Sequence, residues 1–167
     1  MPMLQALLED RFRLKVHRET KEGSIFELTA AKGGSKLRPL QEGSCVAADP
    51  NSPPRPLAPA QKPPCGVLMP GANTANRTMT IDAVGAPIAL LTRTLTLMLG
   101  RPVLDKTGIA GLLDAFHLEY VREDAAADAT GPSIFTSLQE QLGLKLEAAK
   151  GPVEVLVIDH VERPTEN

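Results

Sequence analysis

The sequence predicts an α+β protein in which short helices pack on antiparallel sheet. Three stretches share one pattern: apolar residues spaced by four, which lie on one face of a helix, and then alternating apolar residues, which are typical of a strand. These stretches begin at Leu4, Leu91 and Ile134, so the offsets are 87 and 43 residues. Helices this short are marginal alone, so their apolar faces are expected to lie on the sheet. The length of 167 residues fits a single α+β domain over residues 1–167.

The first copy is predicted to be a helix from Leu4 to Phe12 and a strand that starts at Leu14. A turn at Glu22-Gly23 then predicts a second strand over residues 25–30. The copy therefore has the order helix, strand, strand, and the same order is expected in the other two.

The second copy is predicted to begin with a helix that has Leu91, Leu95 and Leu99 on one face, with Pro87 in its first turn and Gly100 as its left-handed end. Strands are expected from Val103 and over residues 116–120, where apolar and polar residues alternate. A further strand is expected over residues 78–84. We assign the aromatic residues of the three copies to the core: Phe12, Phe116, Tyr120 and Phe135.

The third copy is predicted to be a helix over residues 134–142, capped by Ser133 and ended by Gly143. After a strand and a turn at 150–152, a second strand is expected over residues 153–161. Its run Val-Glu-Val-Leu-Val-Ile is apolar on both faces, which is typical of a covered central strand.

A Pro-rich loop over residues 41–72 is expected after the first copy, because 7 of the 15 prolines lie between Cys45 and Cys65. A loop of this size allows the two Cα atoms to approach within the roughly 7 Å that a disulfide requires. We favour a Cys45–Cys65 disulfide, which implies an oxidising compartment. Two unrelated free thiols are an alternative. A metal or redox site is the third, and clustered further ligands are missing for it.

No catalytic, cofactor-binding or metal-binding residue is predicted. His17, His117 and His160 do not have metal-ligand spacing, and the first two are expected to point outward from strands. No serine lies in a Gly-x-Ser-x-Gly motif. No cofactor is therefore expected.

The loop Asp105, Lys106, Thr107 and Gly108 has two interpretations. It is either a ligand contact or a turn in which Asp105 accepts hydrogen bonds from the backbone and Gly108 supplies a positive φ. We favour the turn and keep the ligand contact as an alternative.

Charge and hydropathy exclude two classes of protein. A net charge of −2 argues against a nucleic-acid binder driven by positive charge. No apolar run is long enough for a transmembrane helix. No signal peptide opens the chain, which conflicts with the expected disulfide and suggests a truncated start.

Three motifs carry a resemblance that spans nearly the whole chain. LQALLEDRF, GRPVLDKTGIAG and SIFTSLQEQLGLKLEAAKGPVEVLVIDHVERPTEN closely resemble the Soli-type family of conserved hypothetical acidobacterial proteins, a domain of unknown function. The resemblance implies export to the periplasm or outside the cell, an additional N-terminal region before the first helix, and no established catalytic residues. Some relatives carry the domain beside a membrane metallopeptidase. The chain departs from the family near Gly111, since Leu113 replaces Tyr, Ala115 is additional and Tyr120 replaces Trp, which predicts a bulge or shifted register.

Together these observations predict a non-enzymatic, extracytoplasmic module that binds a protein partner or cell-envelope ligand through an exposed strand edge. A ligand-sensing domain linked to a membrane metallopeptidase-type system is the first alternative. An enzyme of unknown class is the second.

Overall fold

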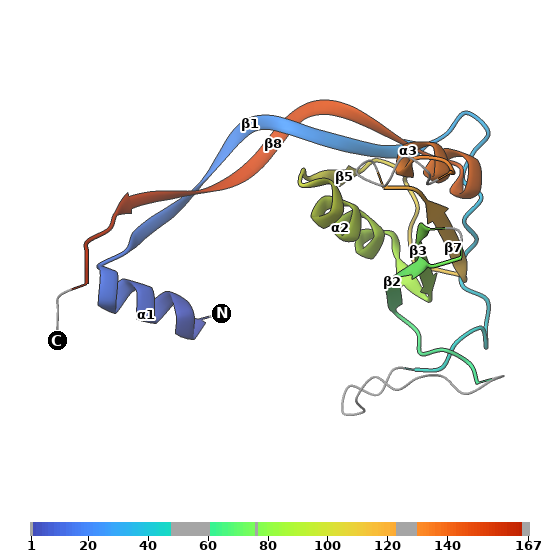
Figure 1. Cartoon of the computed structure of the whole chain (residues 1–167), viewed down its shortest axis with the longest axis horizontal. Helices are drawn as coiled ribbons and strands as arrows, with labels where there is room; N and C mark the ends of the chain where they lie inside the picture. The colour runs from blue at the N-terminus through green and yellow to red at the C-terminus, as the bar shows by residue number, and fades with distance from the viewer. Residues whose placement is uncertain (1, 48–60, 76, 123–129, 165–167) are drawn as a thin grey trace. The chain divides into compact units, whose positions relative to one another are not determined.

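The computed structural model describes residues 2–47, 61–75, 77–122 and 130–164 (Figure 1). Its fold is of the predicted α+β class, and within these ranges no helix has the length and apolar character needed to cross a membrane. The helical elements are α1 (Pro2–Phe12), α2 (Ile88–Leu99), α3 (Ile134–Ser137) and the π-helical segment η1 (Leu138–Leu142). The strands are β1 (Lys15–Ala30), β2 (Val67–Asn73), β3 (Thr78–Val84), β4 (Ala86–Pro87), β5 (Val103–Asp105), β6 (Leu112–Leu113), β7 (Phe116–Tyr120) and β8 (Leu144–His160).

The chain divides into two compact units, which are described separately. Unit 1 contains residues 1–25 and 150–167, and unit 2 contains residues 26–149. Strands β1 and β8 each contribute residues to both units. Whether residues 1–167 behave as one domain stays a prediction.

The strands form three sheets, with strand orders β5-β1-β8, β2-β3-β7 and β4-β6. β5 is parallel to β1, with Phe26 opposite Val103. β3 is antiparallel to both neighbours, and it pairs Ile81 with Pro70 on β2 and with Leu118 on β7. β8 lies at one edge of its sheet, and β2 and β7 lie at the two edges of theirs.

One apolar core fills unit 2, and it joins both larger sheets to α2, α3 and η1. Leu95, Leu118 and Leu138 are fully buried in it. Tyr120 is buried as predicted, while Phe116 and Phe135 are half-buried and pack against the core. The other buried core residues are Phe26, Leu28, Ile81, Ile88, Leu91, Val103, Leu113, Ile134, Leu142, Leu144 and Leu146.

The ends of two helices follow local sequence as predicted. Gly100 and Gly143 both have a φ of 65°, in the left-handed region that glycine adopts without strain. Ser133 accepts a hydrogen bond from the backbone N of Thr136 at the start of α3. Pro87 lies one position earlier than predicted, as the N-cap residue of α2.

Two of the three predicted hairpins are wrong. Glu22-Gly23 and residues 150–152 do not turn, because they continue inside β1 and β8. The first and third copies are therefore a helix followed by one long strand, whereas the second has the expected order, with β5 and β7 as its two strands after α2 and the two-residue β6 between them. An internal repeat of helix, strand and strand is thus not supported. Near Leu113, Asp114 and Ala115 separate β6 from β7, so the predicted bulge is an interruption of the strand.

The predicted Pro-rich loop 41–72 is only partly described, since residues 48–60 lie outside the described residues. Its last part is wrong, because β2 begins at Val67. Pro70 fits there because β2 is an edge strand, where a missing N–H does not break the ladder.

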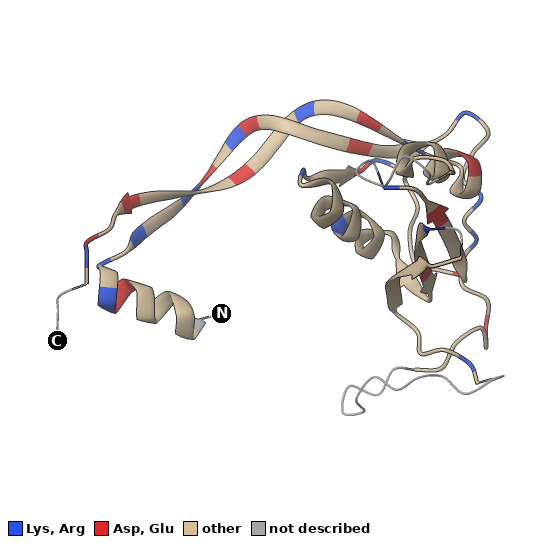
Figure 2. Cartoon of the chain, in the orientation of Figure 1, with Lys and Arg blue, Asp and Glu red and all other residues tan. Residues whose placement is uncertain are grey.

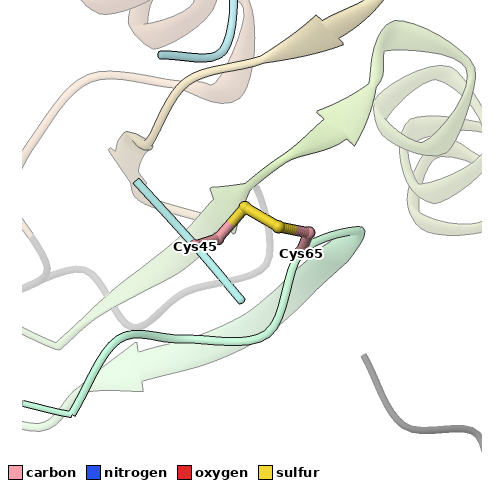
Figure 3. The surroundings of a disulfide bond; sticks show 2 residues. All are labelled: Cys45 and Cys65. Carbon is pink, nitrogen blue, oxygen red and sulfur yellow. A yellow bond between two sulfur atoms is a disulfide. The ribbon is translucent and has the colours of Figure 1, made fainter. Parts of the chain in front are cut away.

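The structure joins Cys45 and Cys65 in the favoured disulfide, with Cα atoms 5.1 Å apart (Figure 3). Backbone hydrogen bonds next to the disulfide join the same two parts of the chain. Cys65 N donates to the Val46 carbonyl at 2.7 Å, and Val46 N donates to the Pro63 carbonyl at 2.9 Å. The disulfide therefore closes both ends of the Pro-rich segment against each other.

In unit 1, several residues predicted as core are exposed. Leu4 on α1 is 57% exposed, although Phe12 is half-buried. Leu156 and Ile158 on β8 are 62% and 60% exposed. The prediction of a covered central strand over residues 153–161 is wrong for this chain, because β8 lies at the edge of its sheet.

Candidate functional site

The Asp105 loop has the geometry of a side-chain-to-backbone turn. The Asp105 carboxylate oxygen Oδ1 accepts from the Thr107 backbone N at 2.9 Å and from its hydroxyl at 2.7 Å. The Thr107 hydroxyl in turn accepts from the Ile109 N at 3.1 Å, and Gly108 has a φ of 71°. These side chains form hydrogen bonds within the loop, whereas the role of Asp105, Lys106, Thr107 and Gly108 in ligand binding stays a prediction.

A polar cavity of about 460 Å³ lies beside Glu119 on β7. The Glu119 carboxylate accepts from the Thr78 hydroxyl and, at 3.2 Å, from the Asn73 amide. Arg77 and Gln141 also line the cavity. Sequence patterns did not indicate this cluster, because its members come from β2, β3, β7 and η1.

Side chains occupy the outer backbone edge of β7. The amide of Gln141 forms two hydrogen bonds with Glu119: its Nε2 donates to the carbonyl at 2.7 Å, and its Oε1 accepts from the backbone N at 2.9 Å. The Ser137 hydroxyl donates to the same carbonyl at 2.7 Å. The Gln141 amide thus makes the hydrogen bonds that a neighbouring strand would make at Glu119, and it blocks strand addition at this point of β7.

The outer edge of β8 in unit 1 differs from that of β7. We call residues 15–25 of β1 and 150–160 of β8 the ribbon. β8 is the last strand of the order β5-β1-β8, so its outer edge has no strand beside it in the described part of the chain. The edge segment 153–158 reads Val-Glu-Val-Leu-Val-Ile and contains no Pro or Lys, the residues with which natural edges repel other strands.

Charged residues of both signs occur along the ribbon (Figure 2). Arg18 Nη1 on β1 donates to Glu154 Oε1 on β8 at 2.6 Å, and Lys150 Nζ lies 4.0 Å from Glu22 Oε1. Because these cross-strand pairs are exposed, each contributes little to stability. The ribbon therefore presents apolar and mixed-charge surface, not a patch of one sign.

His17 joins the two strands of the ribbon through two carboxylates. Its Nδ1 lies 2.8 Å from Asp159 Oδ1 on β8, and its Nε2 lies 2.9 Å from Glu19 Oε1 on β1. Only the protonated imidazole donates from both nitrogens at once. The hydrogen bond to Asp159, followed by that to Glu19, raises the pKa of His17 above its ordinary value of 6.5. Hydrogen bonds from His17 and then Lys21 lower the pKa of Glu19.

This geometry predicts a pH dependence of ribbon opening. A raised His17 pKa means that its stabilisation is complete below pH 6.5 and is lost as the pH rises through the folded-state pKa. The Glu19 contribution is instead lost as the pH falls through its lowered pKa. We therefore expect amide exchange at β1 and β8, corrected for intrinsic rates, to show most protection at pH values above the lowered pKa of Glu19 and below the raised pKa of His17. Asp159→Asn should flatten the basic side of that profile, and an unchanged profile would contradict the assignment.

The three histidines point to solvent, as the alternation in β1 and β7 predicted for His17 and His117. His117 Nδ1 lies 2.7 Å from Asp82 Oδ1, and His160 Nε2 lies 2.8 Å from Glu162 Oε1. Among the residues that the structure describes, no group of three or more His, Cys, Asp or Glu side chains is placed to hold a metal ion.

A long edge strand with apolar residues, a disulfide-closed Pro-rich segment and sheets packed against helices define a chain of the α+β class. The chain belongs to the family described as "Protein of unknown function (DUF3738)", which matches residues 1–161. The resemblance to a domain of unknown function is thereby confirmed, while the acidobacterial origin and the Soli-type grouping stay predictions. Neither a curated protein nor a solved structure matches the chain.

Proposed function

We propose that this protein is a non-enzymatic, extracytoplasmic interaction module that binds an extended segment of a polypeptide along the outer edge of β8. The observation that carries the proposal is the contrast between the outer edges of β7 and β8. Gln141 and Ser137 occupy the edge of β7. The edge of β8 is long and apolar, and no strand of the described residues lies beside it. Strand addition satisfies backbone donors and acceptors and leaves specificity to alternate side chains.

Two further features support the proposal. Leu156, Ile158 and Val161 are more than half exposed, and a bound strand would cover side chains beside it. The Cys45–Cys65 disulfide supports a location outside the cytoplasm, since such bonds persist in oxidising compartments.

The test places a photo-reactive amino acid at position 156 of the full chain and irradiates it in the envelope fraction of the source cells. Position 97 is the matched control, because Leu97 is 77% exposed on α2, outside the ribbon. We expect a reproducible adduct from position 156 only, mapped by mass spectrometry to one segment with alternating apolar residues. Introducing Ile158→Lys into the same chain should lower the yield of the adduct from position 156 about tenfold.

Equal adducts from positions 156 and 97, or none from position 156, would overturn the proposal. An adduct that persists unchanged in the Ile158→Lys chain would also count against strand addition, because a charge beside the bound strand must weaken it.

A further inference from the structure

The chain itself contains a strand that complements the edge of β8. If two copies of β8 pair antiparallel about Val157, Leu156 of each copy lies opposite Ile158 of the other. Val153 lies opposite Val161 in the same register, so all three of the exposed apolar residues Leu156, Ile158 and Val161 gain an apolar partner. Directly opposed pairs of this kind are the unit that stabilises a sheet.

Charge agrees with this register. Glu154 lies opposite His160 of the second copy, and no two groups of like charge are opposed between positions 151 and 163. A shift that centres the pair on Leu156 places Ile158 opposite Glu154. A shift that centres it on Val155 places Ile158 opposite Pro152. Of these three registers, only the one centred on Val157 gives both Leu156 and Ile158 an apolar partner, with Val155 opposite Asp159.

Two-fold symmetry preserves the faces of the ribbon. An axis perpendicular to the ribbon at Val157 keeps Leu156 and Ile158 of both copies on one face, as an isologous interface requires. The result is a four-stranded sheet in the order β1-β8-β8-β1. Two-stranded ribbons are marginally stable in water, and three or more strands are needed for independent stability.

The amino-acid pattern of β8 fits this arrangement better than it fits an edge. Val153–Ile158 is apolar on both faces, the pattern that predicted a central strand, and pairing with a second copy gives β8 a neighbour on each side. We propose that β8 of one copy pairs antiparallel with β8 of a second copy, centred on Val157. This inference rests on the proposed strand addition and names its partner as a second copy of this chain.

The first test is the mass of the full chain in solution. The chain has a mass of 17.8 kDa, so light scattering at about 100 μM should give roughly twice that value. The double variant Leu156→Lys with Ile158→Lys opposes like charges across the axis, and we expect its dimer dissociation constant to rise about 100-fold. Leu97→Lys, which places the same charge on α2, should leave the dimer unchanged.

A second variant does not depend on disrupting the ribbon. Opposed residues in an antiparallel pair have Cα atoms about 4.5–5.5 Å apart, within disulfide range. Val157→Cys should therefore form a covalent dimer under mild oxidation, reversed by reductant, whereas Leu97→Cys should not.

A monomeric mass together with no Val157→Cys dimer would overturn the inference. A dimer that persists in the double-lysine variant would overturn it as well, because the contact would then lie elsewhere. In either case the photo-adduct at position 156 still decides separately whether β8 receives a strand from a different polypeptide.

Discussion

Gly143→Ala is expected to destabilise unit 2 by about 3 kcal/mol. Gly143 has a φ of 65°, which costs an L-residue roughly 1–2 kcal/mol. An added Cβ would also overlap the carbonyl oxygen of Gly34 and lie 2.9 Å from the backbone N of Lys36. These backbone atoms cannot move freely, because Lys36 N donates to the Leu142 carbonyl and Ala31 N donates to the Gly143 carbonyl, each at 2.9 Å. Urea unfolding followed by circular dichroism measures the loss.

Gly100→Ala is the matched control for this substitution. Gly100 has the same φ of 65°, but an added Cβ there meets no atom within 4 Å. We expect a loss of only about 1 kcal/mol from the backbone conformation alone. Equal losses for the two variants would show that the contact between Gly143 and the 34–36 turn has no energetic role.

Removing the disulfide with Cys45→Ser and Cys65→Ser is expected to cost up to about 3 kcal/mol. The bond closes a segment with a sequence separation of 20, and its loss frees that segment in the unfolded state. The seven prolines already restrict the unfolded segment, so the loss should fall somewhat below the value for a flexible loop. Urea unfolding of the oxidised protein and of the double variant measures the difference.

Reductant provides the control for the disulfide. It should destabilise the wild-type protein to the level of the double variant and leave the double variant unchanged. Wild-type unfolding that does not respond to reductant would contradict a stabilising bond. Intact mass before and after reduction, with alkylation of free thiols, checks the bonding directly.

Helix ends could be predicted from sequence because their causes are local. Ser133 caps α3 with its own hydroxyl, and Gly143 ends η1 through its own backbone conformation. The aromatic residue Tyr120 could be assigned to the core from alternation within β7 alone. In each case the residue and its reason lie within a few positions of each other.

The hairpins could not be predicted, because distant pairing overrode the local turn signal. Gly23 lies inside β1, where an added Cβ would come within 2.8 Å of the Val153 side chain on β8. This glycine therefore permits the close approach of β8. A glycine in a sequence can thus indicate either a turn or a position within a strand where another strand packs closely. Pro152 is similarly compatible with β8 because β8 is an edge strand.

The sequence predicted the type of binding surface but not the strand that provides it. An exposed strand edge was expected, but the strand that provides it was assigned to the covered centre of a sheet. The hydrogen bonds of the Gln141 amide to the backbone of Glu119 could not be predicted. The two residues are 22 positions apart, and no local sequence pattern marks such a contact. Alternation did place His17 on the outer side of its strand, but it did not reveal Asp159, 142 residues further along.

The pairing of β1 with β8 also determines when the protein can finish folding. Glu162 N donates to the Phe12 carbonyl at 2.7 Å, so β1 can complete its pairing with β8 only after the intervening residues have been synthesised. At about 5–20 residues per second, the interval between them lasts on the order of ten seconds. During that time β1 lacks the strand with which it pairs in unit 1 of the folded protein.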